Sequence, residues 1–187
     1  MRANMQVQII TDASPWGIGA VLVATGVVEY IADQVSKHDE TVMNIAAGTH
    51  LGQQAREALA VLVAMRAWKE YWCDVRVSLA LRGDNVGALT TVAKLQASSP
   101  SLRLVARELA LEIADGSFAP DVVEHIAGVA NVLAGKLCRK FDPRVADWSL
   151  PNELRDATRR ECVIRTPAWW KTVARPSLLI SEVLQGS

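Results

Sequence analysis

Several residue types are scarce in this chain of 187 residues, and their scarcity narrows what the protein can be. The three cysteines, Cys73, Cys138 and Cys162, lie far apart and form no C-x-x-C pair. That pattern predicts free thiols in a reducing compartment rather than a disulfide framework. No charge is in excess either, because 20 basic and 20 acidic side chains cancel. A strongly basic nucleic-acid binder is therefore excluded, and any contact with nucleic acid must depend on a local arrangement of charge.

Long apolar runs are absent as well. No run reaches the roughly 18 residues that a membrane span requires. The N-terminus also lacks the basic segment and apolar stretch of a signal peptide. These absences predict an intracellular protein, cytoplasmic or nuclear, with no membrane partner.

Half of the residues are hydrophobic, which is enough for one domain with a sizeable core. Three short β-rich runs near the N-terminus are separated by breaks that contain Gly or Pro, a pattern typical of an antiparallel meander. These runs cover residues 7–11, 17–23 and 27–31. Residues 38–50 have no clear period and are expected to form a loop.

Helices and strands are expected to alternate along the rest of the domain. Residues 53–72 are rich in helix formers, lack Gly and Pro, and are apolar on two rows, which predicts a largely buried helix. The other expected elements are strands at 75–81 and 121–126, a turn at Gly128, and helices at 85–96, 102–115 and 131–140, with Ser101 as N-cap and Gly116 as stop of the second of these helices.

The composition changes after Pro143. The following residues carry prolines, arginines and three of the six tryptophans, with little periodicity. This change predicts a domain at residues 1–142 and a C-terminal extension or linker of unknown role at residues 143–187.

Three carboxylates occupy notable positions in this order of elements. Asp12 ends the first strand, Glu57 lies in the first long helix, and Asp84 follows the fourth strand. Taken singly, the two aspartates fit a turn and a helix cap, and the glutamate fits a solvated helix position, although its row is apolar. If strands one and four are neighbours under that helix, all three carboxylates converge at one end of the sheet.

Converging carboxylates repel one another, and proteins tolerate them where hard divalent cations bind between them. An all-oxygen set of ligands favours Mg²⁺ or Mn²⁺ over Zn²⁺. The pattern therefore predicts a site for two-metal phosphoryl transfer.

Four sequence blocks stand in order along the chain: "TDASPWGIGAVL" (11–22), "QQAREALAVLVAMRAW" (53–68), "LRGDNVGAL" (81–89) and "HIAGVANVLAGKLCRK" (125–140). Together they resemble the motif blocks of the ribonuclease H domain of retroelement reverse transcriptases, of the long-terminal-repeat and tyrosine-recombinase types. The resemblance covers about residues 7–140, and it depends on the order and spacing of the blocks because each alone is weak. It implies an α/β, ribonuclease-H-like fold: a five-stranded mixed sheet, its first three strands antiparallel, flanked by helices.

The resemblance also implies cleavage of the RNA strand of RNA–DNA hybrids by two Mg²⁺ ions held in a D-E-D-D set. Carried over by motif, Asp12, Glu57 and Asp84 are its first three members, in catalytic and metal-binding roles. Gly135 stands where the fourth aspartate is expected, and Cys138 stands where serine is common. Loss of one ligand and one negative charge is expected to lower activity by orders of magnitude or to abolish it.

Two other acids could replace the missing carboxylate. Asp142 lies roughly 10 Å further along a continuous helix, so it reaches the site only if that helix ends early. Glu124 lies at the end of the fifth expected strand, near the same edge of the sheet.

Four further residues are candidates for function, each with a structural alternative. His125 either transfers a proton in catalysis or is a polar residue at a strand end. Asn85 and Asn131 either contact the hybrid or cap turns and helices. Arg139 either follows phosphates, together with nearby basic side chains, or belongs to an ordinary solvated surface.

Three functions remain open. The first is a metal-dependent endonuclease acting in retroelement reverse transcription, with an upstream reverse transcriptase domain of the same polyprotein as partner. The second is a catalytically inactive module that binds a nucleic-acid duplex or supports a polymerase, as the glycine at position 135 favours. The third, a transposase or integrase of the same broad fold, fits less well because those enzymes do not use this four-block pattern.

Overall fold

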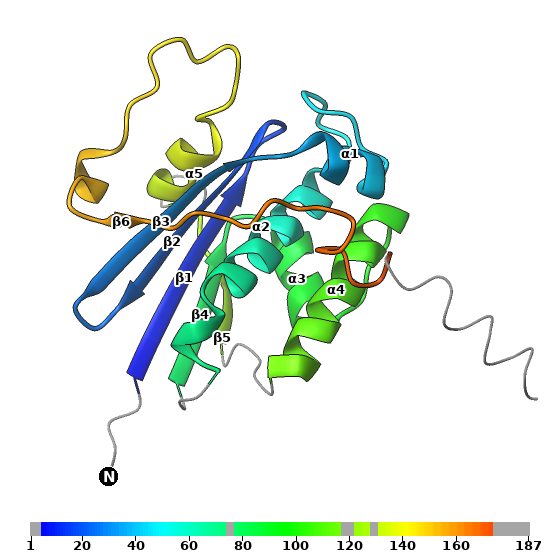
Figure 1. Cartoon of the computed structure of the whole chain (residues 1–187), viewed down its shortest axis with the longest axis horizontal. Helices are drawn as coiled ribbons and strands as arrows, with labels where there is room; N and C mark the ends of the chain where they lie inside the picture. The colour runs from blue at the N-terminus through cyan, green and yellow to red at the C-terminus, as the bar shows by residue number, and fades with distance from the viewer. Residues whose placement is uncertain (1–4, 74–76, 117–121, 128–130, 174–187) are drawn as a thin grey trace, which may run out of the picture.

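The computed structural model describes residues 5–73, 77–116, 122–127 and 131–173 of the chain. A single mixed sheet has the strand order β5-β4-β1-β2-β3-β6, with helices on both faces (Figure 1). The strands are β1 (Met5–Ala13), β2 (Gly17–Ala24), β3 (Val27–Gln34), β4 (Val77–Gly83), β5 (Val122–His125) and β6 (Thr158–Arg159). The α-helices are α1 (Lys37–Met43), α2 (Gln53–Ala67), α3 (Val86–Lys94), α4 (Pro100–Gly116) and α5 (Val132–Cys138).

The predicted meander is confirmed, because β1 pairs antiparallel with β2 and β2 with β3. Strand β4 pairs parallel with β1 on its other side, and β5 pairs parallel with β4. The carboxyl ends of β1, β4 and β5 therefore meet at one edge of the sheet. The fold is the expected α/β architecture, with β6 as a sixth, two-residue strand parallel to β3.

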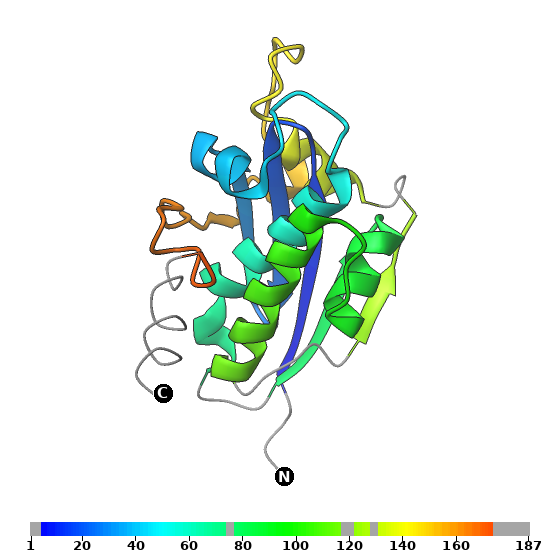
Figure 2. The same cartoon turned by 90° about the vertical axis from the view of Figure 1, so that its right-hand side faces the viewer.

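Alternate residues of β2 face opposite layers. Ile18 and Leu22 point into the main core beneath α2, whereas Val21 packs with Leu137 of α5. Helix α2 thus covers one face of the sheet, with α4 packed against α2 from outside, and α5 covers the other face (Figure 2).

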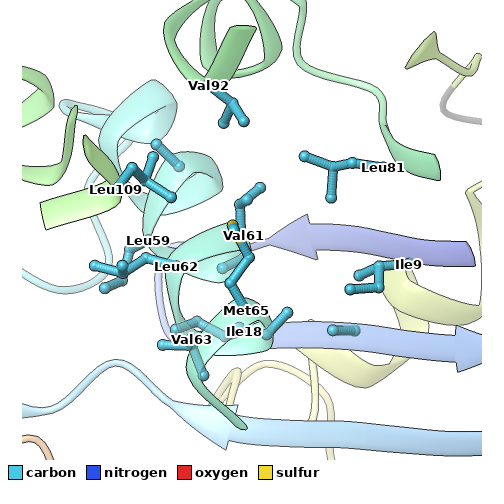
Figure 3. Packing of buried hydrophobic residues seen from close by; sticks show 14 of the residues in the cluster. Ile9, Ile18, Leu59, Val61, Leu62, Val63, Met65, Leu81, Val92 and Leu109 are labelled. Carbon is cyan, nitrogen blue, oxygen red and sulfur yellow. The ribbon is translucent and has the colours of Figure 1, made fainter. Parts of the chain in front are cut away.

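The main core forms around α2, which is buried from Ala55 to Met65 as its two apolar rows predict. Its side chains lie between the sheet residues and the residues of α3 and α4, as Figure 3 shows for Val61 and Met65. Helix α2 ends at Ala67, earlier than predicted, and a short 3₁₀ turn follows at Lys69–Tyr71.

The expected loop at residues 38–50 is wrong in its first part, where the structure has helix α1. Ser36 caps this helix: its hydroxyl accepts from Asp39 N at 3.1 Å, and the Asp39 carboxylate accepts from Ser36 N at 2.9 Å. A reciprocal capping box stabilises seven residues that have no apolar period. The S-x-x-D spacing was the available signal, and a search for periodicity cannot detect it.

Two other local expectations need comment. The cap of α4 is Ser99 rather than Ser101, because the Ser99 hydroxyl accepts from Leu102 N at 3.3 Å while Ser101 lies within the helix. The helix ends at Gly116 as predicted. The expected turn at Gly128 lies outside the described residues.

The extension after Pro143 packs back on the domain. It adds β6 to the sheet edge and then crosses to α4, as the orange and red segment of Figure 1 shows. Arg165 is buried and pairs with Asp39 at 2.7 Å, and Trp170 is fully buried in the main core. The division into a domain at 1–142 and an extension at 143–187 stays a prediction.

Of the described helices, none is long and apolar enough to cross a membrane.

Candidate metal centre

Three carboxylates meet in a pocket of about 460 Å³ at the carboxyl edge of the sheet. Asp12 is the penultimate residue of β1, and Asp84 directly follows β4, its parallel neighbour. Glu57 lies in the second turn of α2, which crosses above this edge. One ligand atom from each residue lies within 4.8 Å of the others. The structure thus brings together the three acids that the sequence singled out.

Burial and mutual repulsion weaken the acidity of two members of the group. Glu57 is only 6% exposed, and burial together with the nearby Asp12 carboxylate raises its pKa to about 9. Burial and the charge of Asp84 raise the pKa of Asp12 to about 6. The metal-free protein therefore retains a proton on Glu57 at neutral pH.

A divalent cation fits this donor set. The three residues offer only carboxylate oxygens, which hard cations such as Mg²⁺ and Mn²⁺ prefer. Gln53 holds Glu57 in place: its amide donates to Glu57 Oε1 at 2.7 Å and to the Ala13 carbonyl at 2.6 Å. An orienting partner of this kind is typical of a metal-binding carboxylate.

Helix α5 comes close to these carboxylates because two glycines of β2 allow it. A Cβ on Gly17 would lie 2.4 Å from the Cys138 carbonyl, and one on Gly19 would lie 2.1 Å from the Ala134 carbonyl. The Ser14 hydroxyl donates to the same Cys138 carbonyl at 2.7 Å and fixes the end of the helix. The G-I-G of the first block therefore seats α5 directly on the sheet.

This packing aims position 135 at the carboxylate group. A Cβ built on Gly135 would lie 2.9 Å from Asp12 Oδ2, and no other atom of the described residues outside α5 lies within 4 Å of it. The thiol of Cys138 lies 3.7 Å from the same oxygen, and burial with the Asp12 charge raises the pKa of that thiol. A helix position that faces the acids thus carries no side chain that could bind a metal, and the group of described carboxylates is Asp12, Glu57 and Asp84.

No protein-family model and no curated protein matches the sequence. Among solved structures, the chain is similar to LC11 ribonuclease H1, isolated from compost by a metagenomic approach, with a TM-score of 0.51 and 15% identity over 77% of this chain and 99% of that one. A ribonuclease H1 from the halophilic archaeon Halobacterium salinarum NRC-1 gives a TM-score of 0.45 and 16% identity over 72% of this chain and 94% of that one. The fold is ribonuclease-H-like. Identity this low shows the fold alone, so the chemistry must be argued from the site.

Glu124 and Asp142, the two acids that the sequence offered as a possible fourth carboxylate, lie in different places. Glu124 pairs with Arg82 at 2.8 Å, and it is not part of the carboxylate group. Asp142 lies on the wall of the pocket, because α5 ends at Cys138 and the turn after it folds back. However, both oxygens of Asp142 are bound by Arg144.

The remaining candidate residues occupy separate places. Asn85 lines the pocket and caps α3, accepting from Ala88 N at 2.9 Å, and Arg139 is an exposed cation on the pocket wall. His125 is exposed at the end of β5, where Nε2 lies 3.1 Å from the Asp84 carbonyl. Asn131 is buried, and its amide donates to the Thr11 carbonyl, which anchors α5 to β1. Their parts in catalysis or hybrid binding stay predictions.

Sequence reasoning did not single out Gln53 and Ser14, which orient the site. Gln53 precedes Glu57 by one helical turn, so i,i+4 spacing was an available signal. Ser14 offered none, because its partner lies 124 residues away.

Proposed function

We propose that this chain is a metal-dependent endonuclease that cleaves the RNA strand of RNA–DNA hybrids. The convergence of Asp12, Glu57 and Asp84 at the carboxyl edge of a ribonuclease-H-like sheet carries the proposal. Three acids within 4.8 Å are costly without a cation, and they are expected where a cation is part of the chemistry.

The three carboxylates would hold Mg²⁺ or Mn²⁺, two ions if the four-block pattern carries its usual mechanism. A bound divalent ion supplies an activated water and stabilises the leaving oxygen of a phosphodiester. Around it, Gln53 keeps the Glu57 carboxylate oriented, and Asn85 presents a polar side chain on the pocket wall. His125 lies beside Asp84 and is the candidate for transferring a proton.

The proposal also assigns the chain to a retroelement. The four blocks between residues 11 and 140 support a ribonuclease H domain of a retroelement polyprotein, whose partner would be a reverse transcriptase domain upstream. The hybrid would be recognised by its shape and 2′-hydroxyls rather than by its bases.

Gly135 supports a second candidate, an inactive module of the same fold that binds a duplex or assists a polymerase. The position that faces Asp12 has no carboxylate, so one metal position is weakened. We expect activity lower by orders of magnitude than in a four-carboxylate variant.

A labelled RNA–DNA hybrid with Mg²⁺ or Mn²⁺ tests both candidates. Cleavage by the natural chain but not by Asp12→Asn supports the endonuclease. Cleavage by Gly135→Asp alone identifies a remnant of a nuclease with three intact ligands. Absence of cleavage in all variants, with hybrid binding retained, supports the binding module. A hybrid that is neither bound nor cleaved contradicts both.

A further inference from the structure

One arginine beside the carboxylates comes from outside the region that carries the four blocks. Arg144 lies on the wall of the same pocket as Asp12 and Asp84, in the turn that follows α5. Its side chain is 67% exposed, so a ligand at the mouth of the pocket can reach it.

Asp142 fixes the orientation of this guanidinium. Arg144 Nε donates to Asp142 Oδ1 at 3.0 Å and Nη2 donates to Oδ2 at 2.8 Å. The Arg144 backbone N–H also donates to Oδ1, at 3.0 Å. The Asp142 side chain is 6% exposed, and the turn is closed by hydrogen bonds from Asp142 N to the Arg139 carbonyl and from Val145 N to the Asp142 carbonyl. A bidentate pair on a closed turn holds the planar group in one direction.

Trp16 supports the guanidinium from a second side. The carbon Cζ of Arg144 lies 4.4 Å from the centre of the Trp16 ring. The backbone N–H of Trp16 donates to the Ser14 hydroxyl at 3.2 Å, which fixes the backbone at this residue, and Gly48 lies against the ring. Stacking on an aromatic ring stabilises a cation, and it leaves the guanidinium edge available.

One nitrogen of this arginine remains open. Arg144 Nη1 has no hydrogen-bond partner among the described residues, whereas Nε and Nη2 are both occupied. A guanidinium that is already ordered loses little conformational entropy when it binds a further acceptor.

The surrounding charge favours an anionic acceptor. Arg139 is exposed on the wall of the same pocket, and it has no ion-pair partner in the described part of the structure. The two arginines thus place positive charge beside the acids of the pocket, although the chain as a whole is neutral. A nucleic-acid backbone fits a surface on which cations lie beside metal-binding acids. One phosphate would lie at the carboxylates and the next at the cations.

We propose that Arg144 binds a backbone phosphate of the nucleic acid adjacent to the one at the carboxylates, and that Asp142 and Trp16 position its guanidinium. The inference rests on the proposed function for its ligand, and it deepens that function by adding a binding residue from the C-terminal extension. It also makes Asp142 a positioning residue rather than a fourth metal ligand, because both of its oxygens are bound by Arg144.

Equilibrium binding of a fluorescent RNA–DNA hybrid in EDTA, where cleavage is excluded, tests the inference. Arg144→Ala is expected to weaken binding about 10-fold and to reduce the slope of log K against log salt by roughly 0.7–0.9, the value for one lost phosphate contact. Arg144→Lys keeps the charge and is expected to restore the slope but not the full affinity. Arg103→Ala is the matched control, since it removes the same charge from an exposed position on α4. Equal affinities and slopes for Arg144→Ala and Arg103→Ala would overturn the inference.

Asp142→Asn tests whether Asp142 positions the Arg144 guanidinium, because the two possible roles of Asp142 predict opposite changes in the affinity for the hybrid. Removing a negative charge would tighten binding if Asp142 only neutralised Arg144. If Asp142 positions the guanidinium, binding becomes weaker despite the added positive charge. An unchanged melting temperature shows that the fold is retained, and a variant that melts early is replaced by Trp16→Leu, which removes the aromatic support and is likewise expected to weaken binding. Tighter binding by Asp142→Asn, or unchanged binding by the Trp16 variant, overturns the positioning role.

The same proteins, assayed for cleavage with Mn²⁺, separate this inference from the proposed function. Binding that depends on Arg144 without any cleavage sustains the inference and overturns the nuclease. Cleavage by the natural chain with no effect of Arg144→Ala sustains the nuclease and overturns the inference. Failure of the natural chain to bind the hybrid at low salt overturns the inference together with the hybrid as ligand.

Discussion

Burial of Glu57 makes the stability of the native state depend on pH. Its carboxylate is shielded from water and faces Asp12, so it keeps its proton up to a pKa of about 9 instead of releasing it near 4.5. A carboxyl group whose pKa is raised on folding stabilises the native state at low pH, and that contribution is lost as pH rises through the folded pKa.

The metal-free protein is therefore expected to lose stability between about pH 5 and pH 9. Asp12, whose pKa is raised to about 6, adds to the loss at the lower end of this window. Thermal unfolding in EDTA measures the effect, and Glu57→Gln should show a flatter profile than the natural chain. Parallel profiles for the two proteins would show that Glu57 does not titrate in this window.

Divalent cations should reverse that loss. Mn²⁺ binds the ionised carboxylates of the native state and not the unfolded chain, so it raises the melting temperature by mass action. The rise is expected to be larger at pH 8 than at pH 5, because protons compete with the metal. Thermal unfolding with and without Mn²⁺ measures it, and an equal rise in Asp12→Asn would place the ion elsewhere.

Gly135 provides a residue-scale test of the missing carboxylate. In Gly135→Asp, the new side chain meets Asp12 Oδ2, so the variant should melt below the natural chain in EDTA through like-charge repulsion. With Mn²⁺ the order should reverse, because a fourth ligand strengthens the metal position. Gly135→Asn is the matched control: it has the same size without the charge, and it should show little reversal. A Gly135→Asp variant that stays below the natural chain in Mn²⁺ would rule out a metal position beside residue 135.

At the scale of elements, the approach of α5 to β2 decides the geometry of the site. Gly19 leaves room for the α5 backbone, which cannot move aside as a flexible side chain can. Gly19→Ala is expected to lower the free energy of unfolding by about 3 kcal/mol, near the upper end of overpacking costs. Gly83→Ala is the control, because its added Cβ would meet neighbours at 3.5 Å or more. Urea unfolding compares the two, and similar costs would show that α5 shifts freely.

At the scale of the whole molecule, the extension is tied to the domain by buried contacts. Trp170 fills the main core, and Arg165 compensates the buried charge of Asp39. Arg66 joins α2 to α4 through Glu108 at 2.7 Å and lies 4.1 Å from the centre of the Trp169 ring. The extension thus contributes to the same packing that supports the sheet.

A chain that ends at residue 142 is therefore expected to be severely destabilised. Loss of Trp170 alone, as Trp170→Ala, should cost about 3–5 kcal/mol through a core cavity. Circular dichroism and urea unfolding of the shortened and full-length chains measure the difference. Equal stability of the two would show that residues 1–142 fold independently of the extension.

Much of the fold could be predicted because its signals are local. The apolar runs of β1 to β3 and the apolar rows of α2 can be recognised within about ten to twenty residues, because the hydrophobic pattern of a strand or helix repeats within that length. Helix α1 was missed because its signal is a cap rather than a period. The sixth strand was missed because two residues carry no pattern, and β6 exists only where β3 offers an edge.

The candidate site could be predicted in part. Order and spacing of the four blocks picked out Asp12, Glu57 and Asp84, and the parallel pairing of β1 with β4 brings two of them to one edge. Asp142 was expected to reach the site only if the helix ended early, and the helix does end before it. Its position on the pocket wall follows from the end of α5 at Cys138.

Sequence alone predicted most of the strands and helices, the three carboxylates and the importance of the glycine at position 135. Those features are written in residue type and spacing along the chain. The folded chain was needed to see that α5 rests on Gly17 and Gly19, so that position 135 faces Asp12, and that Arg144 is held between Asp142 and Trp16. Apart from the pair of Arg144 with Asp142, each of these approaches joins residues more than a hundred positions apart in the chain. Local preference carries no information about which distant segments will pack together.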